Sequence, residues 1–345
     1  MKRVISIVVL SCLCLMGIQA QNDMDAFLFS QSDWEGTARF CGAGGAFGAV
    51  GAEYSALATN PASIGVYKKS EVTLTPLVVS IFKNNSLYNG NRSDYLASHY
   101  NFANVGAVFT FPTSEGKMMK AYQIGFGYNR TYNFNNQFSI SGTSDHSSLL
   151  DEYVDNANKT SSLSDFNTGL AWDTWLMDYD SLAGRYWSPL EKHNLEQAKY
   201  VKTSGGIDEL NFSFGGNYNN QFYFGATIGV PFLDYKEQGT FSEDNLEDTQ
   251  TSIAGYTLHS NNSTEGVGVN LKLGFLYQPA DFVRIGVAFH TPTYYGKLKN
   301  SYNYDINSLI NDRNYTSESD NGWYNYKLTT PLRVHVDAAF FIQKR

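Results

Sequence analysis

The chain has 345 residues, and its 33 Asp and Glu against 25 Lys and Arg give a formal net charge of −8 at pH 7. A protein with this charge is not expected to bind nucleic acid, because that binding requires a basic surface. The 24 Tyr, 23 Phe and 30 Gly, with only 17% charged residues, are typical of an all-β protein of an outer membrane. No long apolar run follows the N-terminus, which argues against helical membrane spans.

The N-terminus has the pattern of a secretory signal peptide. Lys2 and Arg3 precede an apolar run over residues 4–16, and the small residue Ala20 follows a few positions later. The apolar run is shorter than the roughly 20 residues that a helical membrane span needs. We therefore predict a signal peptide over residues 1–20, cleaved near Ala20.

The mature chain begins with a polar stretch, which we expect to be flexible, and continues with a segment dense in Gly and Ala, residues 34–67. Small residues let backbones approach closely, so this segment suits the inside of a larger structure better than a solvated linker. Pro61 ends it, because proline forbids continued helix and pushes Asn60 toward an extended conformation. We predict that residues 21–69 form an N-terminal periplasmic segment and a hatch. The hatch motif consists of Gly44, Gly45, Gly48, Asn60, Pro61 and Ala62.

From residue 70 to residue 345 the sequence alternates with a period of two. In the clearest stretch, Tyr122, Ile124 and Phe126 alternate with Gln123 and Gly125. This period predicts strands with one apolar face and one polar face, and the aromatic rings are typical of the membrane interface. The predicted strands cover residues 71–83, 99–112, 122–129, 207–217, 221–235, 265–278, 282–304 and 323–342. We therefore predict an antiparallel transmembrane β-barrel over residues 70–345.

The connections between the predicted strands alternate in length. Short turns follow the second, fourth and sixth strands, whereas long polar loops follow the others. The predicted long external loops are residues 84–98, 136–205, 236–263 and 307–321. Outer-membrane barrels have this asymmetry, with short periplasmic turns and long loops outside.

Charged side chains lie on the polar face of the later strands. They are costly in lipid, so we expect them to face the barrel lumen. The residues concerned are Lys272, Arg284, Arg333, His335 and Asp337. The alternative interpretation is a solvated interior in which these charges have no special role.

The predicted strand count conflicts with the predicted hatch. An eight-stranded barrel fills its interior with its own side chains and leaves no room for an inserted segment. The sequence also ends in Gln343-Lys344-Arg345, whereas an aromatic residue usually ends the last strand of such a barrel. We therefore expect this chain to be the front part of a longer barrel, with a C-terminal truncation.

The sequence resembles the long-chain fatty acid transporter family, the FadL and TodX-like proteins. The branch often labelled hemin receptor or outer membrane transport protein is the more similar one. The resemblance runs from about Ala26 to the C-terminus and is specific in Gly-Ala-Gly-Gly-Ala-Phe-Gly-Ala at 42–49 and in Asn60-Pro61-Ala62. It implies a barrel of 14 strands, about eight of them present here, with an N-terminal hatch that admits hydrophobic molecules.

The resulting hypothesis is passive uptake of long-chain fatty acids or aromatic hydrocarbons. An apolar groove in the loop 136–205 would receive the ligand, and burial of the ligand there would contribute roughly 25 cal/mol per Å². The candidate groove residues are Trp172, Trp175, Tyr179, Tyr186 and Trp187. The alternative for this aromatic cluster is a packed core that keeps a long loop folded.

Other functions have weaker support in the sequence. No Gly-x-Ser-x-Gly elbow and no His-x-x-Glu-His spacing is present, so an enzyme is not expected. A structural or adhesin-type barrel without transport stays open, and hemin binding depends on the family label alone. No cofactor or metal is expected. The expected partners are membrane lipid, a hydrophobic small-molecule ligand and the barrel-assembly machinery, for a monomer in the outer membrane of a Gram-negative-type bacterium.

Overall fold

The structure is a computed structural model that describes residues 23–33, 35–190, 194–246 and 253–342. It divides into two compact units, Met1–Gln31 and Ser32–Arg345. In the first unit, α2 (Asp23–Phe29) is a short helix, which corrects the expectation of a flexible start. Met24, Phe27 and Leu28 are three and four positions apart, a spacing that gives one apolar stripe on a helix. The predicted signal peptide lies outside the described residues.

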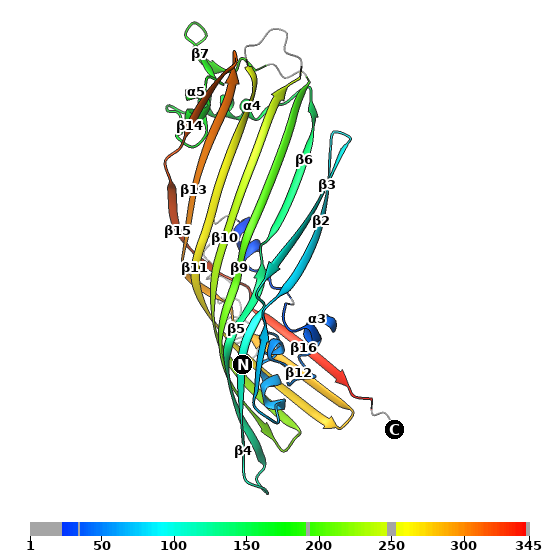
Figure 1. Ribbon diagram of the computed structural model, residues 1–345. Helices are drawn as coiled ribbons and strands as arrows, with labels where there is room; N and C mark the ends of the chain where they lie inside the picture. The colour runs from blue at the N-terminus through cyan, green and yellow to red at the C-terminus, as the bar shows by residue number, and fades with distance from the viewer. Residues whose placement is uncertain (1–22, 34, 191–193, 247–252, 343–345) are drawn as a thin grey trace, which may run out of the picture. The chain divides into compact units, whose positions relative to one another are not determined.

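The second unit contains a curved antiparallel sheet of 12 strands (Figure 1). The order of neighbouring strands across the sheet is β1 (Glu71–Thr75), β4 (Asn104–Pro112), β5 (Met119–Asn133), β9 (Leu195–Tyr218), β10 (Phe222–Asn245), β11 (Ile253–Ala280), β12 (Val283–His290) and β16 (Arg333–Phe340). The remaining strands of this sheet are β6 (Asn136–Ser144), which pairs with β9, and β13 (Tyr294–Ile310), which pairs with β11, β14 (Arg313–Glu318) and β15 (Gly322–Thr329). The chain is thus predominantly antiparallel β-sheet, as predicted.

Several strands are consecutive pieces of one longer pass of the chain. β12 and β13 both pair with β11 and are separated by residues 291–293, where Pro292 has no N–H to donate to a neighbour. β5 and β6 both pair with β9 in the same way. Counted in this way, the described chain runs along the 12-stranded sheet eight times, at 71–75, 104–112, 119–144, 195–218, 222–245, 253–280, 283–310 and 313–340. β2 and β3, which lie between the first two of these runs, form a separate two-stranded sheet.

Three of the predicted loops are strands, which corrects the sequence analysis. Residues 84–98 belong to a hairpin of β2 (Val78–Tyr88) and β3 (Asn91–Asn101). Its turn is Asn89-Gly90, with φ of 46° and 85°, as in the Asn-Gly turns that match the twist of a hairpin. β10 and β11 stay paired over 236–244 and 255–263, and β13 and β14 over 305–310 and 313–318. Most residues of these segments are polar, so a period of two is absent there although the backbone pairing continues.

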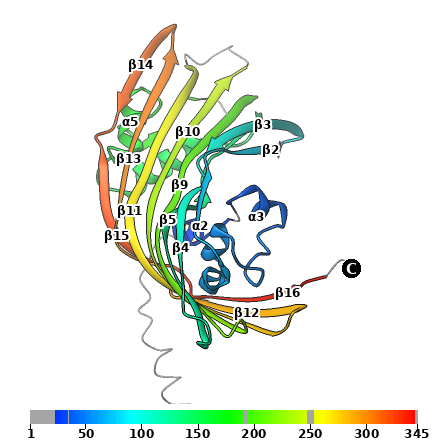
Figure 2. The ribbon, with the colours of Figure 1, turned by 60° about the horizontal axis from the view of Figure 1, so that its bottom comes forward.

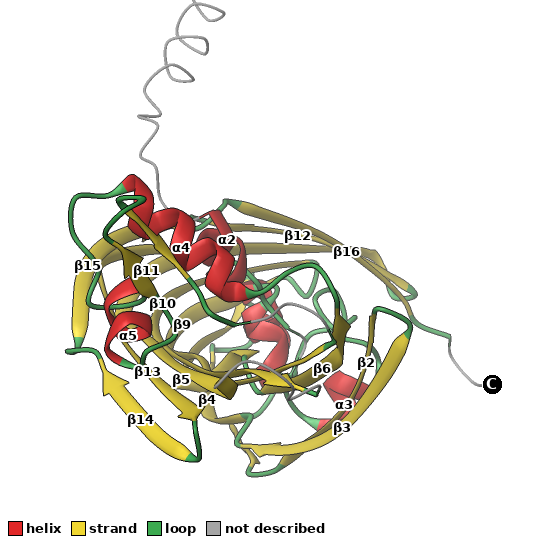
Figure 3. Cartoon of the chain, turned by 90° about the horizontal axis from the view of Figure 1, so that it is seen from above, coloured by secondary structure: helices red, strands yellow, loops and turns green. Residues whose placement is uncertain are grey.

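The long predicted loop 136–205 is also partly regular. It contains β6, the first part of β9, helix α4 (Leu149–Lys159), helix α5 (Thr168–Asp173) and a small hairpin of β7 (Asp178–Asp180) and β8 (Arg185–Trp187). Buried residues of the two helices and of the chain that follows α5 form one core with residues of β9, β11 and β13. In Figure 3, which views the sheet from the upper end of Figure 1, α4 and α5 lie at this upper end.

The sheet has two free edges among the described residues. β1 pairs with β4 alone and β16 pairs with β12 alone, so the backbone ladder does not close on itself. The concave side holds α3 (Ala38–Gly42) and two 3-10 helices, η1 (Tyr54–Ala58) and η2 (Pro61–Val66). Figure 2 shows this segment, in blue, within the curve of the sheet.

Candidate functional site

The segment of residues 35–67, called the inner segment below, is shaped by its own caps. Thr37 Oγ1 accepts a hydrogen bond from the Phe40 N–H at 3.2 Å at the start of α3. At the start of η2, Asn60 Oδ1 accepts from the Ala62 N–H at 3.0 Å, and Pro61 occupies the first helical position. An Asn cap followed by Pro is a typical helix start, since Pro has no N–H to leave unsatisfied.

Glycines of the sheet make room for η2. A Cβ added at Gly225 of β10 would lie 2.2 Å from the Pro61 carbonyl oxygen, and one added at Gly274 of β11 would lie 2.2 Å from Asn60 Oδ1. Such distances are not tolerated, so η2 contacts the sheet backbone to backbone. The fit explains why glycine recurs on the polar face of the strands.

Large side chains of the inner segment fill the remaining space. Tyr54, Leu57 and Ile64 pack with Val108 of β4 in one buried cluster. Burial raises the pKa of the Tyr54 phenol to about 12, so this ring is neutral at pH 7. The inner segment therefore has a small hydrophobic core of its own against the sheet, and it is a packed element.

Polar side chains of β12 and β16 bind the backbone and caps of the inner segment. Arg284 donates from Nη1 to the carbonyl oxygens of Val50 and of Ala49, the latter at 3.2 Å. His290 Nε2 lies 3.0 Å from the Thr59 carbonyl oxygen, which only accepts, so this nitrogen donates. Asn60 Nδ2 donates to Asp337 Oδ2 at 3.1 Å, while Oδ1 of the same side chain accepts from the Ala62 N–H and caps η2.

The charges predicted to face a lumen all lie on the concave face. Arg284 and Asp337 hold the inner segment as just described. Lys272 forms an ion pair with Glu209 in which both side chains are almost fully buried, and Asn270 Nδ2 donates to the other oxygen of Glu209 at 2.8 Å. The Glu209 carboxylate was missed in the sequence, although its position on the polar face of β9 follows from the period of two. The His335 ring lies against His290, with ring centroids 4.6 Å apart, and Arg333 is the partly exposed neighbour of His290 across the β12–β16 ladder.

The residues of the predicted hatch motif have two separate roles. Asn60, Pro61 and Ala62 are buried against the sheet. Gly48 lies beside Asp337, where a Cβ would be 2.4 Å from the carboxylate oxygens. Gly44 and Gly45 have φ of 60° and 79° and form the turn after α3, where the left-handed conformation requires glycine. A Cβ at Gly44 would meet nothing within 4 Å, so this residue does not touch the sheet.

The convex face of the sheet is an apolar band. One row across the strands joins Phe109, Ile124, Phe214, Ala226, Leu273, Phe289 and Val334. The large side chains of this row are exposed, as are those of the parallel row that contains Phe111, Tyr122 and Phe275. A soluble monomer rarely exposes a continuous apolar patch beyond a few hundred Å². An apolar patch of this extent is typical of a surface that meets a membrane or another protein.

Both borders of the apolar band are defined. On β10 the outward residues are apolar from Phe222 to Phe232, a length that matches the about 9–11 residues of a membrane-spanning strand. Aromatic rings lie at the border near the short turns, where Phe222 stacks on Tyr277 at 4.8 Å. Charged pairs lie at the opposite border: Arg130 with Asp208, Lys236 with Asp234 and Lys299 with Glu265.

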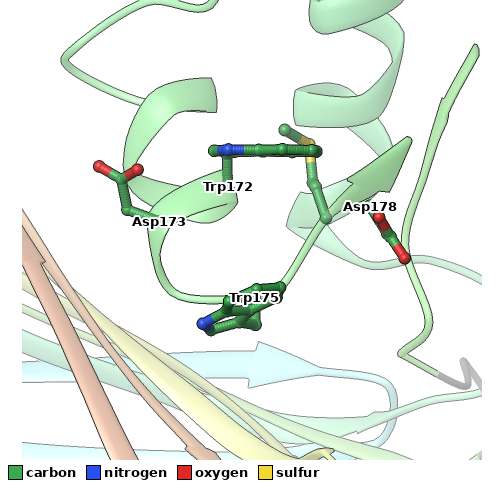
Figure 4. Close-up of a pocket in the computed structure, with 5 residues that line it drawn as sticks. Trp172, Asp173, Trp175 and Asp178 are labelled. Carbon is green, nitrogen blue, oxygen red and sulfur yellow. The ribbon is translucent and has the colours of Figure 1, made fainter.

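The predicted groove residues are only partly brought together. Trp172 and Trp175 line a hollow of about 180 Å³ with Asp173, Met177 and Asp178 (Figure 4). This volume is below the roughly 300–1,000 Å³ of sites for drug-sized ligands. Tyr186 contacts Trp172 edge to face at 5.8 Å and Tyr179 at 5.0 Å. Trp187 pairs through its backbone with Asp178.

The buried core of this region is formed by other residues than the predicted aromatic cluster. Leu170, Ala171, Leu176 and Met177 are buried there, whereas Trp175 is 63% exposed. The described residues contain no group of three or more His, Cys, Asp or Glu side chains placed to hold a metal ion. None of the described helices is both long and apolar enough to cross a membrane.

Comparisons with known proteins add little. No family model matches the chain, and no curated protein matches it. A search of solved structures returned OmpTdeltaL8, a loop L8 deletion mutant of OmpT, an outer membrane protein of Vibrio cholerae, at 9% identity, over 79% of this chain and 100% of that chain. Its TM-score of 0.10 carries no structural argument.

Proposed function

We propose that this chain is an outer-membrane protein of the FadL and TodX-like type, whose sheet forms part of a transmembrane β-barrel and whose inner segment is the hatch. In this proposal the protein takes up hydrophobic small molecules passively. The observation that carries the proposal is the difference between the two faces of the 12-stranded sheet. Its convex side is an apolar band with defined borders, and its concave side is fitted by glycines to one segment of the same chain.

The physical basis of membrane insertion is the apolar band. Burial of its side chains in lipid stabilises the inserted state by roughly 25 cal/mol per Å². The charges of the concave face are kept from lipid, where each would be costly. The charged pairs at one border of the band lie where a strand leaves the hydrocarbon and enters the headgroups.

The hatch in this proposal is closed by a small number of polar contacts. Arg284, His290 and Asp337 hold it at β12 and β16, while the opposite side is held by packing of η1 and η2 on β4, β5, β9 and β10. A ligand passes when the hatch shifts away from the β12–β16 side. Loss of one anchoring side chain lowers the free energy needed for that shift.

The proposal is tested by uptake of radiolabelled oleate into vesicles that contain albumin. We expect uptake above that of protein-free vesicles, and faster uptake for Arg284→Gln, because this variant loses the bonds to the Ala49 and Val50 carbonyls. Arg92→Gln is the matched control, since Arg92 is exposed on the β2–β3 hairpin, where it forms an ion pair with Asp94. Its uptake should equal that of the wild type.

The second candidate is a structural barrel without transport. The filling of the concave face by a packed segment favours it. Inserted protein that gives no oleate uptake, in both the wild type and Arg284→Gln, would contradict transport and leave this candidate. Hemin binding gains no support at the His290–His335 pair, since Nε2 of His290 is already bonded to the Thr59 carbonyl.

A further inference from the structure

A hollow of about 860 Å³ lies on the convex face, at the charged border of the apolar band. It is formed by β10, β11 and β13, and its lining includes Phe232, Val267, Lys236, Lys297 and Lys299. Its volume falls within the roughly 300–1,000 Å³ of sites that take small organic ligands. This hollow belongs neither to the hatch nor to the aromatic region of residues 172–187.

The hollow exists because the ladder is irregular at this level. The register between β13 and β15 shifts between Tyr295 and Leu298, and the register between β11 and β13 shifts between Gly266 and Gly268. A bulge turns two successive residues to one side, and here both Gly296 and Lys297 are exposed. Because Gly296 carries no side chain, the convex face is hollowed beside the outward Lys297.

The lining divides into an apolar part and a cationic part. Phe232 and Val267 are the last apolar residues of the band on their strands, and they are exposed. Above them, Lys236 lies 3.5 Å from Asp234, and Lys299 lies 4.0 Å from Glu265. Lys297 has no ion pair among the described residues, so the rim carries an excess of positive charge.

We propose that this hollow binds the phosphorylated headgroup of a lipid of the outer leaflet, with an acyl chain lying on Phe232 and Val267. The inference rests on the proposed membrane insertion, in which the long excursions of the chain face outward. Charge and position both fit such a lipid. Lys297, which has no ion pair among the described residues, would lie at the level of the headgroup phosphates, and Phe232 and Val267 would lie next to it at the level of the acyl chains. A headgroup phosphate is the anion present at this depth in every such membrane.

The test is retention of lipid by the full-length protein in detergent micelles, measured by native mass spectrometry with phosphatidylglycerol and with phosphatidylcholine. We expect preferential retention of phosphatidylglycerol, and a loss of about fivefold in Lys297→Gln, the effect of one basic residue near an anionic surface. Gly296→Leu keeps the charge but fills the hollow; its Cβ would lie 3.3 Å from the Tyr294 ring, the end of an exposed side chain that has to shift slightly. It should lose the preference as well.

Lys159→Gln is the control, because Lys159 is exposed on α4, far along the chain from the hollow. Equal retention of the two lipids, or unchanged retention in both Lys297→Gln and Gly296→Leu, would overturn the proposal. Displacement of the lipid by inorganic phosphate alone would also overturn it, because the acyl chain would then contribute nothing. Carbonate-resistant insertion into vesicles is measured on the same samples, so failure of the hollow and failure of membrane insertion are distinguishable.

Discussion

Single residues decide whether the inner segment fits the sheet. Gly225 of β10 and Gly296 of β13 both lie in strands of the 12-stranded sheet, but Gly225 faces the inner segment and Gly296 faces the convex side. A Cβ at Gly225 would lie 2.2 Å from the backbone of Pro61, whereas the nearest atom to a Cβ at Gly296 is 3.3 Å away, on the exposed ring of Tyr294. The same substitution at the two positions therefore separates the effect of contact with the inner segment from the effect of glycine in a strand.

We predict that Gly225→Ala lowers the free energy of unfolding by about 1–3 kcal/mol, as overpacking does. Gly296→Ala should leave it unchanged or raise it by up to about 1 kcal/mol, because alanine loses less backbone entropy on folding than glycine. Urea titration in micelles, followed by Trp fluorescence, measures both. Protease cleavage within residues 35–67 should increase for Gly225→Ala alone. Equal stability of the two variants would show that the inner segment does not press on β10.

At the scale of elements, one buried carboxylate connects α4 to the sheet. Glu243 of β10 is fully buried and accepts from the Leu149 N–H at 3.0 Å, from Gln197 Nε2 at 2.7 Å and from Tyr256 Oη at 2.8 Å. Ser148, the N-cap of α4, donates to it as well. The carboxylate thus holds the first turn of α4, where the helix dipole also favours negative charge.

We predict that Glu243→Gln destabilises the region of α4 by about 1–3 kcal/mol, because the neutral amide loses the charge-assisted hydrogen bonds that the buried carboxylate accepts. Hydrogen exchange of residues 150–157 should become faster, while exchange in the central parts of β9 and β10 stays the same. Glu196→Gln, at an exposed position of neighbouring β9, is the matched control. Unchanged exchange in α4 for Glu243→Gln would mean that the apolar core alone fixes the helix.

The elements were predictable from sequence where one face is apolar and the other polar. Tyr122 to Tyr128 and Phe222 to Phe232 alternate for this reason, and strands lie at both places. The prediction failed at 236–244 and 255–263, where β10 and β11 stay paired although most of their residues are polar. β9 begins at Leu195, within the predicted loop 136–205, because pairing with β6 and β10 outweighs local preference. Asn89-Gly90 is a typical hairpin turn sequence, but most residues on both sides of it are polar, so the region was predicted as a loop.

At the scale of the whole second unit, the candidate site was predicted in part. Asn60-Pro61-Ala62 drew attention as a motif, and these residues lie buried against the sheet. The partners Gly225 and Gly274 were visible as members of the polar face, but no sequence pattern shows which residue a glycine accommodates. The contact of Asn60 with Asp337 joins positions 277 residues apart, a separation that only the folded chain brings together.

The central claim is that the convex face of the sheet meets lipid. Adjacent residues of β10 test it, because Ile228 is exposed on the apolar band and Thr227 is fully buried on the concave face. Single cysteines at these positions, in a Cys41→Ser background that removes an exposed thiol, would carry a nitroxide label in reconstituted vesicles.

The measurement is the collision rate of each label with molecular oxygen, which concentrates in lipid, and with a water-soluble nickel chelate. We predict that the label at Ile228→Cys collides with oxygen and hardly with nickel, whereas the label at Thr227→Cys is shielded from both. Frequent collisions of the Ile228→Cys label with nickel would place the convex face in water. Shielding of that label from both reagents would place it against protein, and either result would contradict the membrane assignment.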